Sequence, residues 1–251
     1  MVAFEQQVRE VCATYRAAPQ RLEKEGIHTV CVDEKTGIQA LEHAAPIKPM
    51  RPGHIEKREA EYIRHGTQTL IGNFEVATGE VIAPTVQQTR NEADFATHIE
   101  QTIATDPEAG WVFVADNLTT HVSATLVLLV ATLCGIPAKL LGVKGKSGIL
   151  KSVSTRKAFL ADVTHRVRFV FVPKHTSWMN QVEIWFSVLS RRVIRRGSFR
   201  STDDLRGRIL KFIDYYNDTM AKPYKWTYAG RVLNVGSKKR KGSQGTWIRP
   251  R

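Results

Sequence analysis

The 251-residue sequence has few cysteines and no long apolar run. Its three cysteines, Cys12, Cys31 and Cys134, are far apart and include no C-x-x-C pair, so they indicate neither a disulfide framework nor a zinc site. The longest apolar stretch, residues 124–134, is too short to cross a bilayer, and the N-terminus shows no basic segment followed by an apolar one. These absences predict a reduced intracellular protein with no membrane partner.

Acidic residues are scarce in the last quarter of the chain. Residues 185–251 contain 17 Lys and Arg against 4 Asp and Glu, whereas residues 1–184 contain 20 of each kind. The formal charge of +13 therefore comes from the C-terminal quarter, which favours a partner with a phosphate backbone. The alternatives are a solubilising basic face or a disordered basic tail at 236–243. An anionic membrane is less favoured, because the basic helix keeps its apolar stripe for a core.

Hydrophobic periodicity and turn signals predict alternating strands and helices. The expected elements are a helix at 3–16 that ends at Pro19, a strand at 28–32, the start of a partner strand at 38–41, a hairpin at 70–83, a helix at 91–105, a strand at 111–115, a helix at 119–134, a strand at 167–172, and helices at 176–196 and 201–216. This order predicts an α/β fold, a mixed sheet with helices on both faces.

The predicted helix at 176–196 contains one residue that its amphipathic pattern does not explain. Its apolar stripe consists of Val182, Trp185, Phe186, Leu189 and Val193. Glu183 lies beside this stripe in the first turns. A lone glutamate there is most simply a solvated charge that interacts favourably with the helix dipole. That interpretation changes if other acidic residues of the sequence are expected to lie close to Glu183 in the folded chain.

Two other acids, Asp33 and Asp116, are expected to lie close to Glu183. Asp33 and Asp116 each follow a predicted strand, and a short loop after a third strand leads to the helix that carries Glu183. Because the carboxyl ends of strands in an open α/β sheet gather ligands, we expect the three acids to converge there. Three carboxylates without compensating bases favour hard cations such as Mg²⁺. Two such ions can activate a water or a 3′-hydroxyl and stabilise the leaving oxygen of a phosphodiester.

Three sequence blocks contain these acids. Residues 30–35 read VCVDEK, residues 112–121 read VFVADNLTTH, and residues 173–186 read PKHTSWMNQVEIWF. They resemble the signature blocks of Tc/mariner-type DDE transposases, most closely those of the bacterial insertion-sequence branch. The resemblance covers residues 28–228. It implies an RNase H-like catalytic core that nicks transposon ends and joins them to target DNA.

The resemblance also implies roles for particular residues. Asp33, Asp116 and Glu183 would be the catalytic acids and the ligands of two Mg²⁺ or Mn²⁺ ions, and Asn117 and Asn180 would orient them. His121 either orients an acid, contacts DNA, or is simply a helix-entry residue. Candidate DNA contacts are Lys144, Lys146, Lys174, His175, Arg191, Arg192, Arg195 and Arg196. Glu34 is not counted as a ligand, because alternation along the strand points it to the opposite face.

The expected organisation has three parts. Residues 1–27 form an N-terminal helix and linker, residues 28–228 the catalytic domain, and residues 229–251 a basic tail. The 66 residues between Asp116 and Glu183 exceed the spacing in many superfamily members, which suggests an insertion near 141–165 that contacts DNA. Family members usually carry a helix-turn-helix region before the first motif. Either this chain is a fragment, the gene is split, or an upstream helix-turn-helix polypeptide supplies end recognition.

The implied partners are transposon-end and target DNA, with a second copy of the chain in the synaptic complex, at the nucleoid of a bacterial cytoplasm. Two alternatives remain open. A catalytically inactive or truncated remnant would bind DNA through its basic quarter without cutting it. An RNase H-type nuclease would prefer RNA–DNA hybrids. The segment Gly145-Lys146-Ser147 is not a P-loop, because position 140 is a leucine where that motif requires a glycine.

Overall fold

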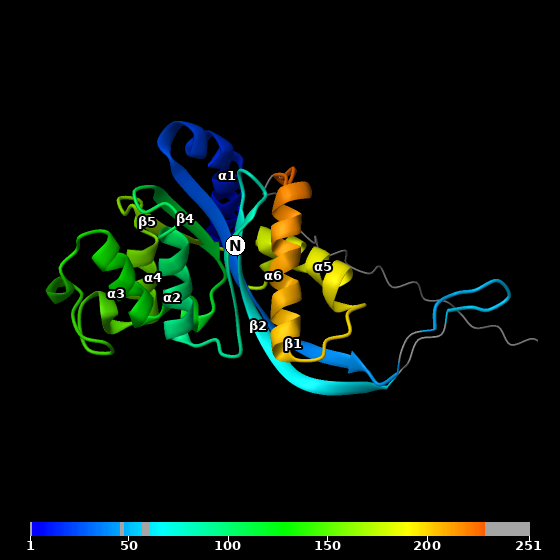
Figure 1. Ribbon diagram of the computed structural model, residues 1–251. Coiled ribbons are helices and arrows are strands. Elements are labelled where there is room, and N and C mark those ends of the chain that lie inside the picture. The colour runs from blue at the N-terminus through cyan, green and yellow to red at the C-terminus, as the bar shows by residue number, and fades with distance from the viewer. Residues whose placement is uncertain (1, 46–47, 57–60, 229–251) are drawn as a thin grey trace, which may run out of the picture.

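The computed structural model describes residues 2–45, 48–56 and 61–228. Its centre is a five-stranded sheet in the order β3-β2-β1-β4-β5 (Figure 1). The strands are β1 (Ile27–His43), β2 (Tyr62–Glu75), β3 (Val81–Gln87), β4 (Gly110–Ala115) and β5 (Val167–Phe171). The first three strands pair antiparallel, whereas β4 and β5 run parallel to β1. The sheet is therefore mixed, as predicted.

Helices cover both faces of this sheet (Figure 1). They are α1 (Val2–Glu25), α2 (Glu92–Ile103), α3 (Ala124–Leu133), α4 (Val153–Leu160), α5 (Gln181–Leu189) and α6 (Thr202–Thr219). Apolar side chains of α1, α5 and α6 share one buried cluster with the sheet, and those of α2, α3 and α4 share another. Strand order, strand directions and the two helical layers are those of an RNase H-like fold, so the predicted fold class is confirmed.

Strand β1 positions the first acid. Val30 and Val32 belong to the cluster under α2 and α3, and Cys31 belongs to the cluster under α5. Alternation along the strand therefore puts Asp33 on the α5 face and Glu34 on the α2 and α3 face. The parallel register with β4 ends near Cys31↔Val114, so both strands leave their paired segment at the same edge of the sheet.

Strand β1 is much longer than the predicted segment 28–32. Residues 38–41 were expected to begin a partner strand, but they continue β1, which pairs with β2 from Val30 to His43. Register shifts between Lys35 and Ile38, where Gly37 has φ +64°, allow the strand to continue past an irregularity. In Figure 1 the far end of β1 runs out beyond the helices together with β2.

Helix α1 also exceeds its prediction. It passes through Pro19 and ends at Glu25, although we expected the helix to end at Pro19. Proline removes one backbone hydrogen bond, but the face of the helix around it is packed against the sheet, with Val11, Tyr15 and Ala18 buried. Tertiary packing therefore outweighs the local signal.

The two helices that follow the parallel strands are both interrupted. The expected helix at 119–134 divides into a 3-10 turn at Thr119–Val122 and α3, whose N-cap is Ser123. The expected helix at 176–196 divides into a 3-10 turn at Ser177–Met179, then α5, and then a π-helical turn at Ser190–Ile194. Asn180 stands at the start of α5, so this helix begins one turn later than predicted.

The segment 141–165 is more ordered than the loop we expected. It contains α4, which Ser152 caps, and its side chains Leu141, Leu150, Phe159 and Leu160 are buried. The predicted basic tail at 229–251 lies outside the described residues. Among the described residues, no helix is both long and apolar enough to cross a membrane.

Candidate active site

Asp33 is the most buried of the three acids. Only 8% of the residue is exposed. Its Oδ1 accepts a 2.8 Å hydrogen bond from the backbone N–H of Glu34, and its Oδ2 lies 3.4 Å from Asn180 Nδ2. Burial, together with the negative charges of Asp116 and Glu183, raises the pKa of Asp33 to about 7. The structure therefore brings the three acids close enough to interact electrostatically.

Asp116 follows β4 and has a different environment. Its Oδ1 accepts a 2.8 Å hydrogen bond from the backbone N–H of Leu118 and lies 2.7 Å from His121 Nδ1. Burial by itself would raise the pKa of Asp116, but the contacts with His121 and the Leu118 N–H bring it below its ordinary value. Asp116 is therefore held ionised, with about a third of its side chain exposed.

His121 lies between two carboxylates. Its Nδ1 faces Asp116, its Nε2 lies 3.2 Å from Glu34 Oε2, and its ring packs 4.2 Å from that of Phe95. Burial would lower the pKa of this fully enclosed histidine, but the two carboxylates outweigh burial and raise it to about 9. His121 is thus a buried cation that fixes Asp116. Glu34 points away from Asp33, as predicted, but sequence reasoning missed its contact with His121.

Glu183 comes from the first turn of α5. It is exposed, and among the described residues its side chain forms no hydrogen bond or ion pair. Its carboxylate nevertheless contributes to the raised pKa of Asp33. Within the described part of the chain, no three His, Cys, Asp or Glu side chains form a group that could hold a metal ion as they stand. The exposed side chain of Glu183 could change rotamer to approach Asp33 and Asp116.

Two asparagines connect the strands and the helix that carry the acids. Asn180 is fully buried, and its Nδ2 donates a 2.9 Å hydrogen bond to the Val32 carbonyl, which ties the start of α5 to β1. Asn117 donates to the Val172 carbonyl and accepts from Lys157, which ties the ends of β4 and β5 together. Asn180 therefore touches an acid directly, whereas Asn117 fixes the loop that follows Asp116.

The donor set fits a hard divalent cation. All three acids offer oxygen ligands, which Mg²⁺ and Mn²⁺ prefer. Burial raises the pKa of Asp33, and the charges of Asp116 and Glu183 raise it further; a bound cation would stabilise the ionised carboxylates against both effects. In addition, Asn180 Oδ1 is buried beside Asp33 without a hydrogen-bond partner, so one more oxygen at this site is unused. A bound divalent cation would compensate the negative charge of these carboxylates.

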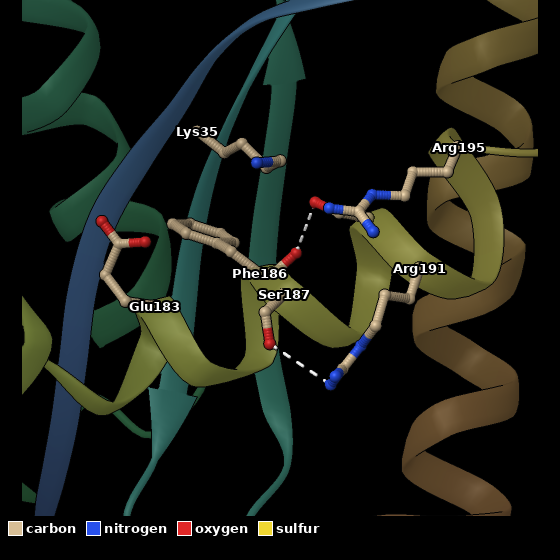
Figure 2. A pocket seen from close by; sticks show the side chains of 7 residues that line it. Lys35, Glu183, Phe186, Ser187, Arg191 and Arg195 are labelled. Atoms are coloured by element: carbon tan, nitrogen blue, oxygen red, sulfur yellow. Dashed lines mark hydrogen bonds between the residues drawn. The ribbon is translucent and has the colours of Figure 1, made fainter.

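Two hollows flank the acids, and basic residues line both. One, of about 310 Å³, lies beside Asp116 and is lined in part by Lys174 and His175. The other, of about 370 Å³, lies beside Glu183 (Figure 2). It is lined by Lys35, Glu183, Phe186, Ser187, Ser190, Arg191 and Arg195. Sequence reasoning missed Lys35, although it stands only two residues after Asp33.

Four of the predicted DNA contacts line neither hollow. They are Lys144, Lys146, Arg192 and Arg196. Lys144 is 3.5 Å from Glu92, and both of these side chains are largely exposed. The predicted basic residues thus separate into a group beside the acids and a group on the outer surface.

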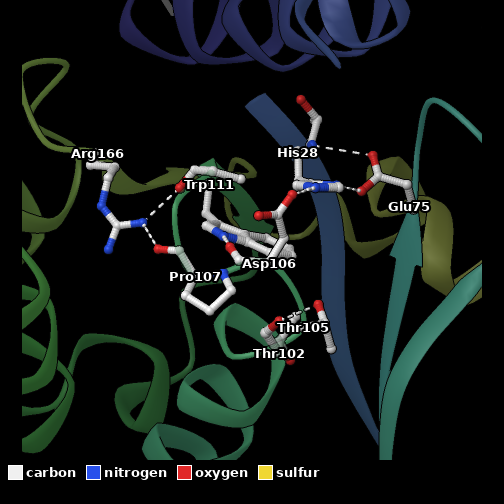
Figure 3. A network of polar contacts seen from close by, with 10 residues as sticks. His28, Glu75, Thr102, Thr105, Asp106, Pro107, Trp111 and Arg166 are labelled. Carbon is white, nitrogen blue, oxygen red and sulfur yellow. Dashed lines mark hydrogen bonds and ion pairs between the residues drawn. The ribbon is translucent and has the colours of Figure 1, made fainter. Parts of the chain in front are cut away.

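A second histidine with two carboxylates lies near the start of β1 (Figure 3). His28 Nδ1 is 2.9 Å from Glu75 Oε2, and His28 Nε2 is 3.4 Å from Asp106 Oδ2. The ring stacks on Trp111 at 4.4 Å, and Glu75 also accepts a hydrogen bond from the backbone N–H of Thr29. This network joins β1 to β2 and to the turn before β4.

Comparison with known protein families identifies the class of protein to which this fold and these acids belong. Residues 28–206 match the family described as DDE superfamily endonuclease, so the chain belongs to this family. The matched segment contains Asp33, Asp116 and Glu183. No curated protein matches the chain.

Solved structures of the Mos1 transposase are also similar to the chain. The pre-cleavage Mos1 transpososome is 14% identical with a TM-score of 0.46, and the match covers 84% of this chain and 56% of that one. The Mos1 strand transfer complex is 12% identical with a TM-score of 0.45, covering 84% and 54%. The catalytic domain of Mos1 mariner transposase is 11% identical with a TM-score of 0.45, covering 83% and 81%. The chain therefore spans little more than half the length of the first two.

Proposed function

We propose that this chain is the catalytic core of a transposase, which cleaves DNA strands at transposon ends and joins them to target DNA. One observation carries the proposal. Asn180, at the start of the helix that carries Glu183, donates to the Val32 carbonyl and lies 3.4 Å from Asp33, while Asp116 follows β4, the strand parallel to β1. The three acids therefore come from three elements that meet at one edge of the sheet, and burial, with the charges of Asp116 and Glu183, raises the pKa of Asp33. Membership of the DDE superfamily endonuclease family supports the same chemistry.

Asp33, Asp116 and Glu183 would hold two Mg²⁺ or Mn²⁺ ions. When bound, such ions supply activation of the attacking water or 3′-hydroxyl and stabilisation of the leaving oxygen. The chain's own residues hold the ligands in place. His121 keeps Asp116 ionised and oriented, and Asn180 keeps Asp33 in register with α5. Glu183 completes the set from a helix whose remaining turns pack firmly in the core.

DNA is the proposed partner, held by Lys174, His175, Arg191 and Arg195 beside the acids. Lys144, Lys146, Arg192 and Arg196 would act at longer range, through the general positive field. A synaptic complex needs two transposon ends, so a second copy of the chain is part of the proposal, as is a helix-turn-helix polypeptide for end recognition. The proposed site of action is the bacterial nucleoid in the cytoplasm.

Substitution of Asp116 tests the proposal. The purified chain is incubated with end-labelled duplex DNA and Mg²⁺ or Mn²⁺, and products are separated on a denaturing gel. We expect cleavage in the parent and a loss of about a thousandfold or more in Asp116→Asn, because removing one ligand forfeits several kcal/mol of transition-state stabilisation. The matched control is Asp106→Asn, which removes an aspartate charge near the other end of β1 and should cut like the parent.

Other outcomes are equally informative. If Asp116→Asn cuts as well as the parent, the assignment of the acids is wrong. If the parent binds DNA but does not cut it with either ion, the chain is a DNA-binding remnant. Preference for an RNA–DNA hybrid over duplex DNA would instead assign an RNase H-type nuclease.

A further inference from the structure

The hollow beside Glu183 (Figure 2) adjoins a second hollow, and together they form a groove that leads away from the acids. We propose that this groove holds the sugar–phosphate backbone of the DNA strand next to the bond that is cut, through Lys35, Arg191 and Arg195, and that it reads no bases. We call it the exit groove. This inference rests on the proposed function and names the part of the surface that positions the strand.

The shape of the surface supports a continuous path. The hollow of about 370 Å³ that includes Glu183 adjoins a second hollow of about 390 Å³. The two share Lys35, Ser190 and Arg195, and the second extends along β1 to Leu41 and Phe199. Both hollows are partly open to solvent. A linear polymer can therefore lie in the exit groove with one end at Glu183.

The charges of the exit groove are available for a ligand. Lys35 Nζ lies 5.9 Å from the centre of the Phe186 ring, and Arg191 Nη2 lies 3.4 Å from Ser187 Oγ. Among the described residues, neither of them nor Arg195 forms an ion pair with a carboxylate. Arg208, by contrast, makes two short contacts with Asp204. Three cations without an ion-pair partner among the described residues therefore line a groove that begins at Glu183, and a polyanion would supply the counter-charge.

Arg191 and Arg195 lie four residues apart at the π-helical turn, a spacing that puts both side chains on one side of this segment. Residues 190–194 close a wide turn in which Arg195 N donates a 2.9 Å hydrogen bond to Ser190 O, five residues back. Such turns frequently occur at functional sites. Arg191 and Arg195 line the exit groove, whereas their neighbours Arg192 and Arg196 are exposed and do not line it. The segment 191–196 thus provides two arginines for the groove and two for the outer surface.

The apolar residues of the exit groove indicate backbone recognition. Phe186 and Phe199 are its two aromatic residues, and they are only 2% and 1% exposed. Neither ring can stack on a base, although stacking on exposed aromatics is the usual means of gripping unpaired bases. Contacts with phosphate carry no sequence information. Binding in the groove should therefore not depend on base sequence.

Two double variants of equal charge test the exit groove. DNA binding is measured by fluorescence anisotropy in EDTA, over a series of KCl concentrations, with two oligonucleotides of unrelated sequence. The variants are Arg191→Gln/Arg195→Gln and the control Arg192→Gln/Arg196→Gln. Both remove two arginines from the same helix, so the long-range field falls equally. Lys35→Gln is measured separately, because it lies on β1 and leaves the π-helical turn intact.

We expect the groove double variant to lose about tenfold more affinity than the control, equally for both sequences. Its slope of log K against log salt should fall by roughly 0.7–0.9 for each lost phosphate contact. Lys35→Gln removes one proposed phosphate contact, so its salt slope should fall by roughly 0.7–0.9. Equal losses in the two double variants, or a loss for one sequence only, would overturn the proposal.

The binding measurement is independent of cutting. If the parent binds DNA and the two double variants differ, but no metal-dependent cleavage occurs, the proposed function fails and the groove stands. If the parent cuts DNA and the double variants bind alike, the proposed function stands and the groove fails. Thermal melting of each variant establishes that it is folded.

Discussion

Two regions of the sheet contain a histidine between two carboxylates, yet they differ in the charge that surrounds them. Near the start of β1, His28 lies 2.9 Å from Glu75 and 3.4 Å from Asp106. At the acid cluster, His121 lies 2.7 Å from Asp116 and 3.2 Å from Glu34. The residue types and distances are similar, so the histidine motif itself does not indicate function.

The surroundings distinguish the two sites. Glu75 is 2% exposed and binds both His28 and the Thr29 N–H, so its oxygens are occupied in joining two strands. At the other site the cation of His121 compensates only part of the negative charge, because Asp33 and Glu183 lie nearby as well. The negative charge that remains uncompensated around His121 is what distinguishes the acid cluster as a site for a bound cation.

The largest expected effect is on stability. The pKa of Asp33 is about 7 in the folded chain and near 3.8 when unfolded, so the folded state binds the proton more tightly and loses stability as pH rises from about 4 to 7. At pH 8 without metal, Asp33→Asn should raise the free energy of unfolding by on the order of 4 kcal/mol, at roughly 1.4 kcal/mol per pKa unit. Glu75→Gln should lower it by about 1–3 kcal/mol, because the buried contacts of Glu75 are lost.

Urea unfolding at pH 8 in EDTA measures both variants. Mg²⁺ should then stabilise the parent but not Asp33→Asn. If Asp33→Asn and Glu75→Gln change stability in the same direction, the contrast between the two sites does not hold.

The second effect is on activity. His121→Gln should reduce metal-dependent cleavage by about 10–100-fold, the usual result of removing a group that orients a metal ligand. His28→Gln should cut DNA at the parent's rate, because its contacts are confined to the other network. Cleavage rates at saturating DNA and metal compare the two variants. A similar fall in both would mean that the histidines act only through stability.

The smallest effect is the pH dependence of the His28 contact. Hydrogen bonding to Glu75 raises the pKa of His28 above its ordinary 6.5, so its contribution to stability is present below that pH and is lost as pH rises through the raised value. The difference in unfolding free energy between the parent and His28→Gln should therefore be larger at pH 6 than at pH 9. It should stay below about 1 kcal/mol, since the ring is partly exposed. A difference that grows with pH would contradict this.

Much of the fold follows from local patterns. The strands at 111–115 and 167–172, the hairpin after residue 70 and the helix capped by Asn91 are present where periodicity and turn residues predict them. The boundaries of these elements depend on residues only a few positions apart, so local sequence patterns are enough to predict them. The convergence of Asp33 and Asp116 follows from the same patterns, because parallel strands end at one edge.

The remaining features depend on contacts between distant parts of the chain. Helix α1 continues through Pro19 because the sheet packs against it, and no neighbouring residue reveals that packing. The pair of Glu34 and His121 joins residues 87 positions apart. The position of Lys35 beside Arg195 likewise depends on how α5 crosses β1. Such features depend on the register of the whole sheet, which local sequence patterns do not reveal.

The π-helical turn at Ser190–Ile194 lets the basic segment absorb a change in chain length. A turn closed from residue i to i+5 contains one residue more than an α-helical turn. Loss of one residue there would convert the bond from Arg195 N to the Ser190 carbonyl into an ordinary α-helical bond, so the residues that follow would keep their direction. In a regular α-helix the same loss would rotate everything that follows by about 100°. The turn is therefore a place where an evolving lineage could lose one residue without redirecting the arginines beyond it.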